Sequence, residues 1–125
     1  MKKTIRTDNA PQPIGPYSQA IAAEGKLLFI SGQIPLKADG SLAGSDINAQ
    51  THQCIKNIEA ILIEAGLTFD NVVKTTVLMV DLGDFGTMNE IYNQYFGESK
   101  PARAAYQVVK LPKEVLIEIE AVAVF

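Results

Sequence analysis

Three predicted strands constrain the fold most, because each carries apolar side chains on both of its faces. They span residues 27–33, 72–82 and 116–125. Alternation along a strand sorts the apolar residues of the middle segment: Val73, Val77 and Met79 lie on one face, and Val72, Leu78 and Val80 on the other. A sheet built from such strands has to be buried on both sides.

The chain offers only two helices to cover that sheet. The first is predicted from an N-cap at Asp46 to about Ala65, with Gly66 just beyond its end, because apolar residues recur there every three or four positions. The second is predicted over residues 85–96. Two helices can cover one face of a sheet, so we expect further copies of the chain to cover the other face in a homo-oligomer. The alternative is an unusually apolar face left open to solvent.

Three more strands complete the predicted pattern. Residues 2–7 alternate weakly and predict a short edge strand. Residues 18–23 and the first two-faced strand flank the turn Glu24–Lys26, which predicts a β-hairpin. A further strand starts after Pro101, whose ring nitrogen has no hydrogen to give to a ladder. The predicted order is β-β-β-α-β-α-β-β, a single α+β domain over residues 1–125 with a mixed sheet and two helices on one face.

Composition argues against several classes of partner. The formal net charge is −3, which argues against a nucleic acid or an anionic membrane surface as the main partner. The single Cys54 excludes an intrachain disulfide, and with the single His52 it argues against a zinc site. The first residues lack the apolar run of a signal peptide or a membrane span. We therefore expect a cytoplasmic protein.

The strongest candidates for chemistry are one arginine and one glutamate in the last quarter of the chain. Arg103 has alanines at 102, 104 and 105, which leave space around a planar two-donor fork that fits a carboxylate. Glu118 and Glu120 share a face of the terminal strand, because side chains repeat every second residue. Arg103 could anchor an anionic ligand while a half-buried Glu handles protons. The alternative is a structural Arg–Glu ion pair.

Other polar residues carry weaker signals. Tyr17 could lie over a cleft, or it could only pack or cap. Gly32, after Ser31, would let a ligand approach its backbone, or it could mark a bulge. Asn89, on the second helix, is otherwise a solvated polar residue. His52 is interpreted as a surface or helix-packing residue rather than a base, and Cys54 as a core residue.

A set of short motifs occurs in one order along the chain. They are AP (10–11), IGPYS (14–18), SGQIP (31–35), QT (50–51), VKTTV (73–77), NEIY (89–92), PAR (101–103), LP (111–112) and IEIEA (117–121). Together they resemble the Rid family of reactive intermediate deaminases, in its RidA or YjgF branch, whose older labels are endoribonuclease and translation inhibitor. Each motif alone is weak, but the ordered set is specific and covers residues 3–125.

The resemblance implies a chorismate mutase-like fold in a homotrimer, with the sheets around a central barrel, the helices outside and active sites in clefts between subunits. It also implies hydrolysis of 2-iminobutanoate and 2-iminopropanoate to 2-oxo acids and ammonia, without a cofactor or metal. Pyridoxal phosphate-dependent Ser/Thr dehydratases would be the functional partners, since they release the parent enamines. Arg103 would bind the substrate carboxylate and Glu118 would orient the attacking water. Tyr17, Ser31, Gly32 and Asn89 would line the pocket.

One position departs from the family pattern. Many members have Cys two residues after the Arg, where this chain has Ala105. A Cys nucleophile is therefore excluded at this site. The resemblance implies that hydrolysis survives, because in the family the backbone carbonyl at this position helps to hold the water. The alternative function is a non-catalytic sensor of small 2-oxo acids or amino acids that regulates a partner protein. RNA cleavage, a third possibility, is disfavoured by the single His and the negative net charge.

Overall fold

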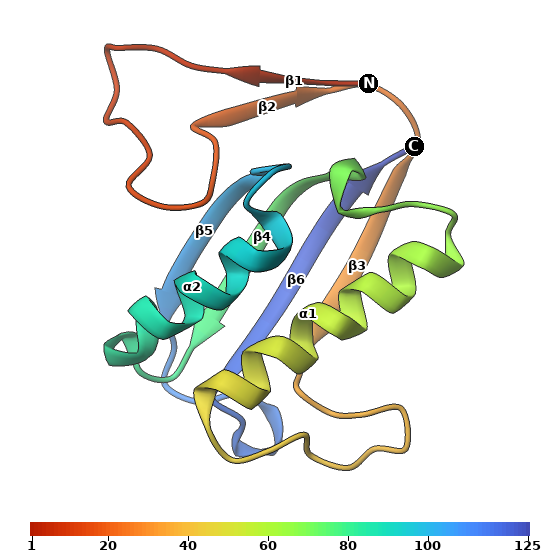
Figure 1. Cartoon of the computed structure of the whole chain (residues 1–125), viewed down its shortest axis with the longest axis vertical. Coiled ribbons are helices and arrows are strands. Elements are labelled where there is room, and N and C mark those ends of the chain that lie inside the picture. The colour runs from red at the N-terminus through yellow and green to blue at the C-terminus, as the bar shows by residue number, and fades with distance from the viewer.

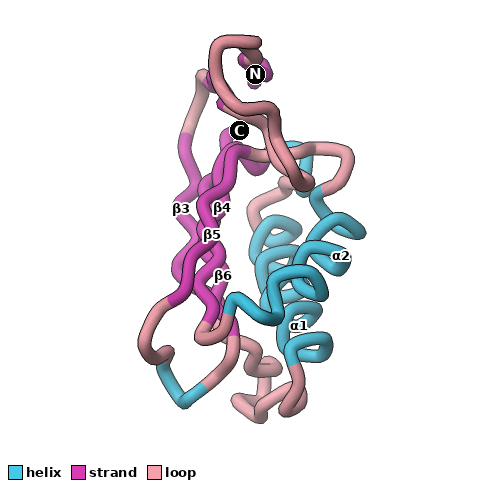
Figure 2. Tube along the Cα trace, turned by 90° about the vertical axis from the view of Figure 1, so that its left-hand side faces the viewer, coloured by secondary structure: helices cyan, strands magenta, loops and turns pink.

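Two amphipathic helices lie side by side on one face of a four-stranded sheet, and the computed structural model describes all 125 residues (Figures 1 and 2). The strands and helices are β1 (Lys2–Ile5), β2 (Ala20–Ala23), β3 (Leu27–Gln33), α1 (Ile47–Glu64), β4 (Val72–Met79), α2 (Phe85–Phe96), β5 (Ala102–Gln107) and β6 (Ile117–Val124). The α+β class, the mixed sheet and the placement of both helices on one face are confirmed.

The sheet has the spatial order β3-β6-β4-β5. Strand β6 is antiparallel to both β3 and β4, whereas β5 runs parallel to β4. The parallel pair needs a crossover connection, and α2 provides it. Strands β1 and β2 form a separate two-stranded sheet above the main one (Figure 1).

Helix α1 begins and ends where its sequence signals indicate. Asp46 is the N-cap, and its Oδ1 accepts a hydrogen bond from the Ala49 N–H at 2.7 Å. Gly66 follows the C-cap with a φ of +75°, a conformation that glycine adopts without steric cost. Neither α1 nor α2 combines the length and apolar character needed to cross a membrane.

The core lies between the helices and the sheet. It includes the apolar stripe of α1, the stripe of α2 and every second residue of β6: Cys54, Ile55, Ile58, Leu62, Met88, Ile91, Tyr92, Phe96, Ile117, Ile119, Ala121 and Ala123. The first buried hydrophobic residue along the chain is Ile30. The β1–β2 sheet therefore contributes no hydrophobic residue to this core.

The predicted hairpin between residues 18–23 and 27–33 is wrong. Strand β2 pairs with β1, and β3 pairs with β6. The chain passes from one sheet to the other at Gly25, whose φ is +138°. The Glu24 N–H donates to the Met1 carbonyl at 3.0 Å, and the Phe125 N–H donates to the Lys26 carbonyl at 2.9 Å. Ile30 of β3 is buried in the core, whereas β2 has no buried residue, so the two strands lie in different environments.

The predicted face of Val72 is also wrong. Val72 is fully buried in the helix-covered core together with Val77 and Met79. A bulge between Val72 and Lys74 shifts the register against β6, and this shift breaks the simple alternation. The prediction ended the strand at residue 82, but β4 ends at Met79.

The other face of the sheet is uncovered in the single chain. On this face of β3, Phe29 is 73% exposed and Leu27 is 50% exposed. Leu78 of β4 and Val122 of β6 are half-buried. Exposed apolar side chains in such a cluster are typical of an interaction surface.

We expect Asp46→Ala to lower the free energy of unfolding by about 1 kcal/mol, because the N-cap bond to the Ala49 N–H is lost. Urea denaturation would measure the change. Asp46→Asn is the matched control, since Asn caps a helix about as well as Asp. An equal loss in both variants would show that the carboxylate acts through its charge rather than as a cap.

Candidate active site

Arg103 lies on β5 without an acidic partner. It is in register with Thr75 of β4, so it occupies the face of the sheet that the helices cover. Its Nη1 donates a hydrogen bond to Oδ1 of Asn89, on α2, at 2.6 Å. The only ion pairs in the chain are Arg6–Asp8 and Lys110–Glu114. The half-buried guanidinium therefore keeps most of its donors free for an anion.

Three aromatic rings surround the guanidinium. The Cζ atom of Arg103 lies 4.8 Å from the ring centroid of Tyr92, 5.2 Å from that of Tyr17 and 5.6 Å from that of Phe85. These distances are typical of cation–π contacts. Burial lowers the pKa of Arg103, and the nearby Tyr92 and Tyr17 oppose this shift. An arginine nevertheless stays protonated in proteins, so the site holds a permanent positive charge.

A cavity of about 190 Å³ opens beside the guanidinium. Its lining residues are Ile14, Tyr17, Phe85, Asn89, Arg103 and Ala105. The backbone at Gly15 approaches both polar side chains closely, because a Cβ at this position would lie 3.2 Å from Nδ2 of Asn89 and 3.3 Å from Nη2 of Arg103. One charged end and mostly apolar walls suit a small carboxylate with an uncharged body.

Glu118 lies on the opposite face of the sheet from Arg103. It pairs with Leu78 of β4, whereas its neighbours Ile117 and Ile119 point into the helix-covered core. The register of β3 shifts between Ile30 and Gln33, so Gly32 lies in a bulge, one of the two interpretations made from sequence. Glu118 packs directly against it: a Cβ on Gly32 would meet the Glu118 carboxylate. Ser31, beside Gly32, is exposed.

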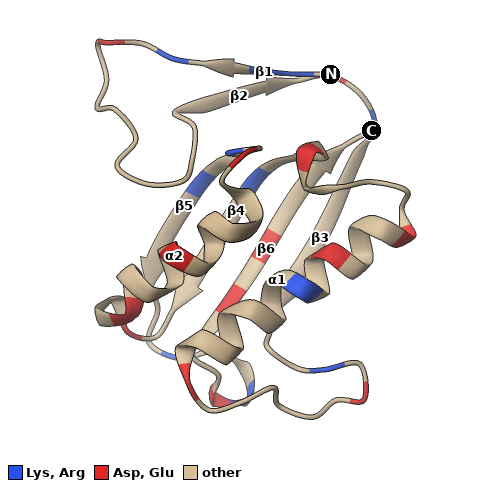
Figure 3. Cartoon of the chain, viewed as in Figure 1, with Lys and Arg blue, Asp and Glu red and all other residues tan.

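The structure thus divides the predicted site residues into two groups. The anchor group is Tyr17, Asn89, Arg103 and Ala105. The carboxylate group is Ser31, Gly32 and Glu118. Acidic residues lie on central β6 and the basic residue on edge strand β5 (Figure 3), and no ion pair joins Arg103 to Glu118 within the chain. The structural Arg–Glu pair is therefore ruled out in the single chain.

His52 and Cys54 have structural positions, as the sequence indicated. Nδ1 of His52, on α1, lies 2.6 Å from the hydroxyl oxygen of Tyr95 on α2, so His52 joins the two helices. Cys54 is fully buried. Burial is the main cause that raises the pKa of its thiol, and Glu118 adds to the effect.

Sequence analysis missed the roles of Phe85, Tyr92 and Gly15. Both aromatic residues belong to the apolar stripe of α2, where they are indistinguishable from ordinary core residues. The available signal was Asn89, which lies four residues after Phe85 and three before Tyr92 on the same helix face. A polar residue between two aromatic ones on one face requires a polar partner, and Arg103 is that partner.

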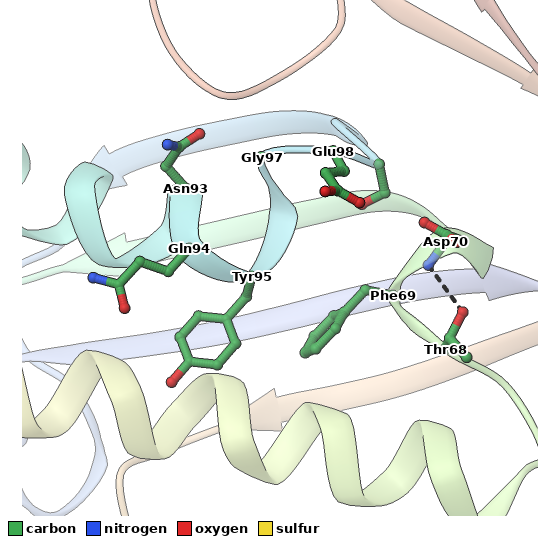
Figure 4. A pocket seen from close by; sticks show the side chains of 9 residues that line it. Thr68, Phe69, Asp70, Asn93, Gln94, Tyr95, Gly97 and Glu98 are labelled. Carbon is green, nitrogen blue, oxygen red and sulfur yellow. Dashed lines mark hydrogen bonds between the residues drawn. The ribbon is translucent and has the colours of Figure 1, made fainter.

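A larger groove of about 560 Å³ lies elsewhere, between the end of α2 and the turn before β4 (Figure 4). Its lining residues are Thr68, Phe69, Asp70, Asn93, Gln94, Tyr95, Gly97, Glu98 and Ser99. None of the predicted site residues is among them, and its charged residues are acidic. Size alone therefore does not make this groove the site for an anionic ligand.

We expect Gly32→Ala to displace the Glu118 side chain, because the new Cβ would overlap its carboxylate. A crystal structure of the variant would show a changed Glu118 rotamer with an intact sheet. Gly86→Ala is the matched control, since a Cβ at that position would meet no atom within 4 Å outside the adjacent turns of its own helix. An unmoved Glu118 in Gly32→Ala would show that the β3 bulge, rather than Glu118, yields to the methyl group.

Comparison with known proteins identifies a matching family and several proteins of similar sequence. A family described as Endoribonuclease L-PSP matches residues 7–125. A RutC family protein of Pyrococcus horikoshii is 57% identical, over 98% of both chains. A protein of Mus musculus named 2-iminobutanoate/2-iminopropanoate deaminase is 50% identical, over 99% of this chain and 92% of its own length.

Solved structures of similar sequence and fold support the same family assignment. The YjgF gene product of E. coli is 46% identical with a TM-score of 0.74, over 98% of both chains. The E. coli protein TdcF, solved with bound serine, is 42% identical with a TM-score of 0.75, again over 98% of both chains. The resemblance found in the ordered motifs is thus confirmed, and the chain belongs to the Endoribonuclease L-PSP family, the YjgF/RidA family of proteins.

Proposed function

We propose that the chain is a hydrolytic deaminase that converts 2-iminobutanoate and 2-iminopropanoate into the 2-oxo acids and ammonia. The observation that carries the proposal is the Arg103 guanidinium, which Asn89 orients and no acidic residue neutralises, at the end of a small cavity with mostly apolar walls. A guanidinium offers two parallel donors to a carboxylate. The relatives that are named 2-iminobutanoate/2-iminopropanoate deaminases, at about 50% identity, support the same reaction.

The proposed reaction requires only a few catalytic functions from the protein. The carbon of a protonated imine is already electrophilic, so the protein has to fix the substrate, place a water and transfer protons. Arg103 holds the carboxylate. Glu118 takes a proton from the water that attacks C2 and passes it to the amino nitrogen of the resulting carbinolamine. The carbinolamine hydroxyl then gives its proton to Glu118 as the C–N bond breaks, which leaves the 2-oxo acid and ammonia. The ammonia finally takes the proton from Glu118 and departs as ammonium, so the carboxylate is regenerated. Ala105 supplies no nucleophile, which this route does not need.

The complete site requires two copies of the chain. Arg103 and Glu118 lie on opposite faces of one sheet, so a single chain cannot present both to one substrate. We propose a homotrimer in which the anchor group of one subunit faces the carboxylate group of its neighbour. The uncovered apolar face around Phe29 supports this assembly, as does the chorismate mutase-like trimer with a central barrel that the family resemblance implies.

The decisive experiment adds the purified protein to a pyridoxal phosphate-dependent threonine dehydratase that is making 2-iminobutanoate. Faster ammonia release than in buffer alone supports the deaminase. No acceleration, together with tight binding of 2-oxobutanoate, would instead support a sensor that uses the same Arg103 anchor without turnover. Neither acceleration nor binding would contradict both functions.

We expect Arg103→Lys to weaken 2-oxobutanoate binding by roughly 10- to 100-fold, because a charge-assisted hydrogen bond contributes about 1.5–3 kcal/mol and Lys cannot form the two-donor fork. Isothermal titration calorimetry would measure the affinity. Arg6→Lys is the matched control, since Arg6 is exposed and pairs only with Asp8 and Gln12. Unchanged affinity in a folded Arg103→Lys variant would remove Arg103 from the site.

We expect Glu118→Gln to lower turnover by about 10²- to 10⁴-fold, the usual contribution of a positioned acid–base group, while product binding is largely kept. Glu120→Gln is the control on the same strand and face, two residues further on. It should retain wild-type turnover, because Glu120 is exposed and makes no side-chain bond within the chain. If the two variants lose turnover equally, the assignment of the base to Glu118 fails.

We expect light scattering at micromolar concentration to give about three times the 13.5 kDa mass of one chain. Phe29→Lys should reduce that mass, since it places a charge on the apolar sheet face that the neighbours would cover. Val109→Lys should leave the mass unchanged, because Val109 is a fully exposed apolar residue outside the strands. A stable wild-type monomer would contradict both the assembly and the shared site.

A further inference from the structure

The guanidinium of Arg103 rests on a ring that is itself held in place. Of the three rings near Arg103, that of Tyr92 is nearest, at 4.8 Å, and Tyr92 is the only fully buried residue among them. Tyr17 and Phe85 are half-buried. Tyr92 is thus the inner floor of the cation site, and the other two rings are its outer walls.

Two contacts fix the Tyr92 ring. Its hydroxyl oxygen lies 2.7 Å from Oγ1 of Thr75, and both residues are fully buried. Thr75 is also the residue of β4 that faces Arg103 of β5 in the sheet register. The ring also stacks on Phe96, with centroids 4.5 Å apart and an interplanar angle of 28°.

Phe96 connects the Tyr92 ring to Phe69, a residue that lines the larger groove. It packs edge-on against Phe69, with centroids 4.9 Å apart. Phe69 also lines the outer groove (Figure 4). Four groups therefore follow one another from the groove to the cation: Phe69, Phe96, Tyr92 and Arg103.

We propose that Tyr92 is a positioning residue that holds the guanidinium of Arg103 in place without occupying its hydrogen-bond donors. An acidic residue in this position would orient Arg103 equally well, but it would neutralise the charge and compete with an incoming carboxylate. An aromatic face attracts a cation through its quadrupole and leaves the N–H groups free. Asn89 complements the ring, because its Oδ1 accepts from Nη1 only.

The hydroxyl of Tyr92 has a structural task rather than a role in proton transfer. Burial is the main cause that raises the pKa of Tyr92 to about 12, so the phenol stays protonated at neutral pH. The hydroxyl anchors the ring to β4 through Thr75. The part of Tyr92 that acts on Arg103 is therefore the ring, and a variant that keeps the ring should keep the effect.

The test compares Tyr92→Leu with Phe96→Leu. Both changes remove a fully buried aromatic ring from α2, but only Tyr92 contacts Arg103. We expect both to lower the thermal unfolding midpoint. Tyr92→Leu should weaken 2-oxobutanoate binding by about 5- to 30-fold, which corresponds to a cation–π contact in a desolvated site. Phe96→Leu should weaken it less, because the Tyr92 ring stays against Arg103. Tyr92→Phe should restore the affinity while its unfolding midpoint stays below that of the wild type, since Thr75 loses its partner.

A second measurement makes the inference independent of ligand binding, which rests on the proposed function. The NMR signal of the Arg103 Nε–Hε group reports how freely the guanidinium moves in the unliganded protein. We expect the fastest motion in Tyr92→Leu and wild-type motion in Tyr92→Phe. Phe96→Leu should give a smaller increase, because the Tyr92 ring loses its stacking partner but stays against Arg103. If wild-type protein neither accelerates ammonia release nor binds 2-oxobutanoate, the proposed function is wrong, and the NMR comparison still decides the role of Tyr92.

The inference is overturned if folded Tyr92→Leu shows wild-type motion of Arg103. It is equally overturned if Phe96→Leu mobilises Arg103 as much as Tyr92→Leu does, because the effect would then be general to the core. Tyr92→Met, which fills more of the ring's volume without its quadrupole, replaces Tyr92→Leu if the latter does not fold, and the same outcomes apply to it.

Discussion

The two-residue alternation of β6 decides where both the core and the carboxylates lie. This strand runs between β3 and β4, so both of its edges are hydrogen-bonded and its side chains can point only up or down. Ile117 and Ile119 face the helices and are completely buried, whereas Glu118 between them faces away. A carboxylate is thereby fixed on a rigid central strand without entering the core, where its charge would be costly. The bulge at Gly32 on β3 leaves the space that this carboxylate needs.

The cation is placed by different means. Arg103 stands on edge strand β5, and its side chain enters the space between the sheet and α2. A charge there needs compensation, and this protein provides it through aromatic faces and one amide rather than through a counter-ion. The result is a site with one positive charge that no acidic residue of the chain neutralises. The proposed binding of a small carboxylic acid depends on that property, and the proposed assembly depends on the placement of Glu118 on the opposite face.

Local sequence signals predicted both helices correctly. The errors concern the strands, whose pairing depends on residues far apart in the chain. The N-cap at Asp46 and the span of α2 follow from contacts within a few residues, which one sequence displays directly. The hairpin prediction failed because the partner of β3 is β6, about ninety residues further along the chain. The bulge at Val72 changed a face that alternation alone had assigned. The sequence also did not show that Arg103 and Glu118 lie on opposite faces of the sheet. Alternation assigns the faces of residues within one strand, but only the register between strands shows whether residues of two strands share a face.

The cavity at Arg103 is built from two parts of unequal rigidity. Its lining residues Phe85 and Asn89 belong to a helix that packs on the sheet, whereas Ile14 and Tyr17 belong to a segment without buried hydrophobic residues. That segment is attached mainly by hydrogen bonds, such as the one from Oγ of Ser18 to the Lys100 carbonyl at 2.5 Å. Segments with few apolar contacts open locally at a small free-energy cost, while the packed layer opens only with global unfolding. Amide hydrogens of the N-terminal segment should accordingly exchange with solvent faster than those of α2. A ligand of the proposed site would then enter from the side of Ile14 and Tyr17, while Phe85 and Asn89 stay in place on the packed helix.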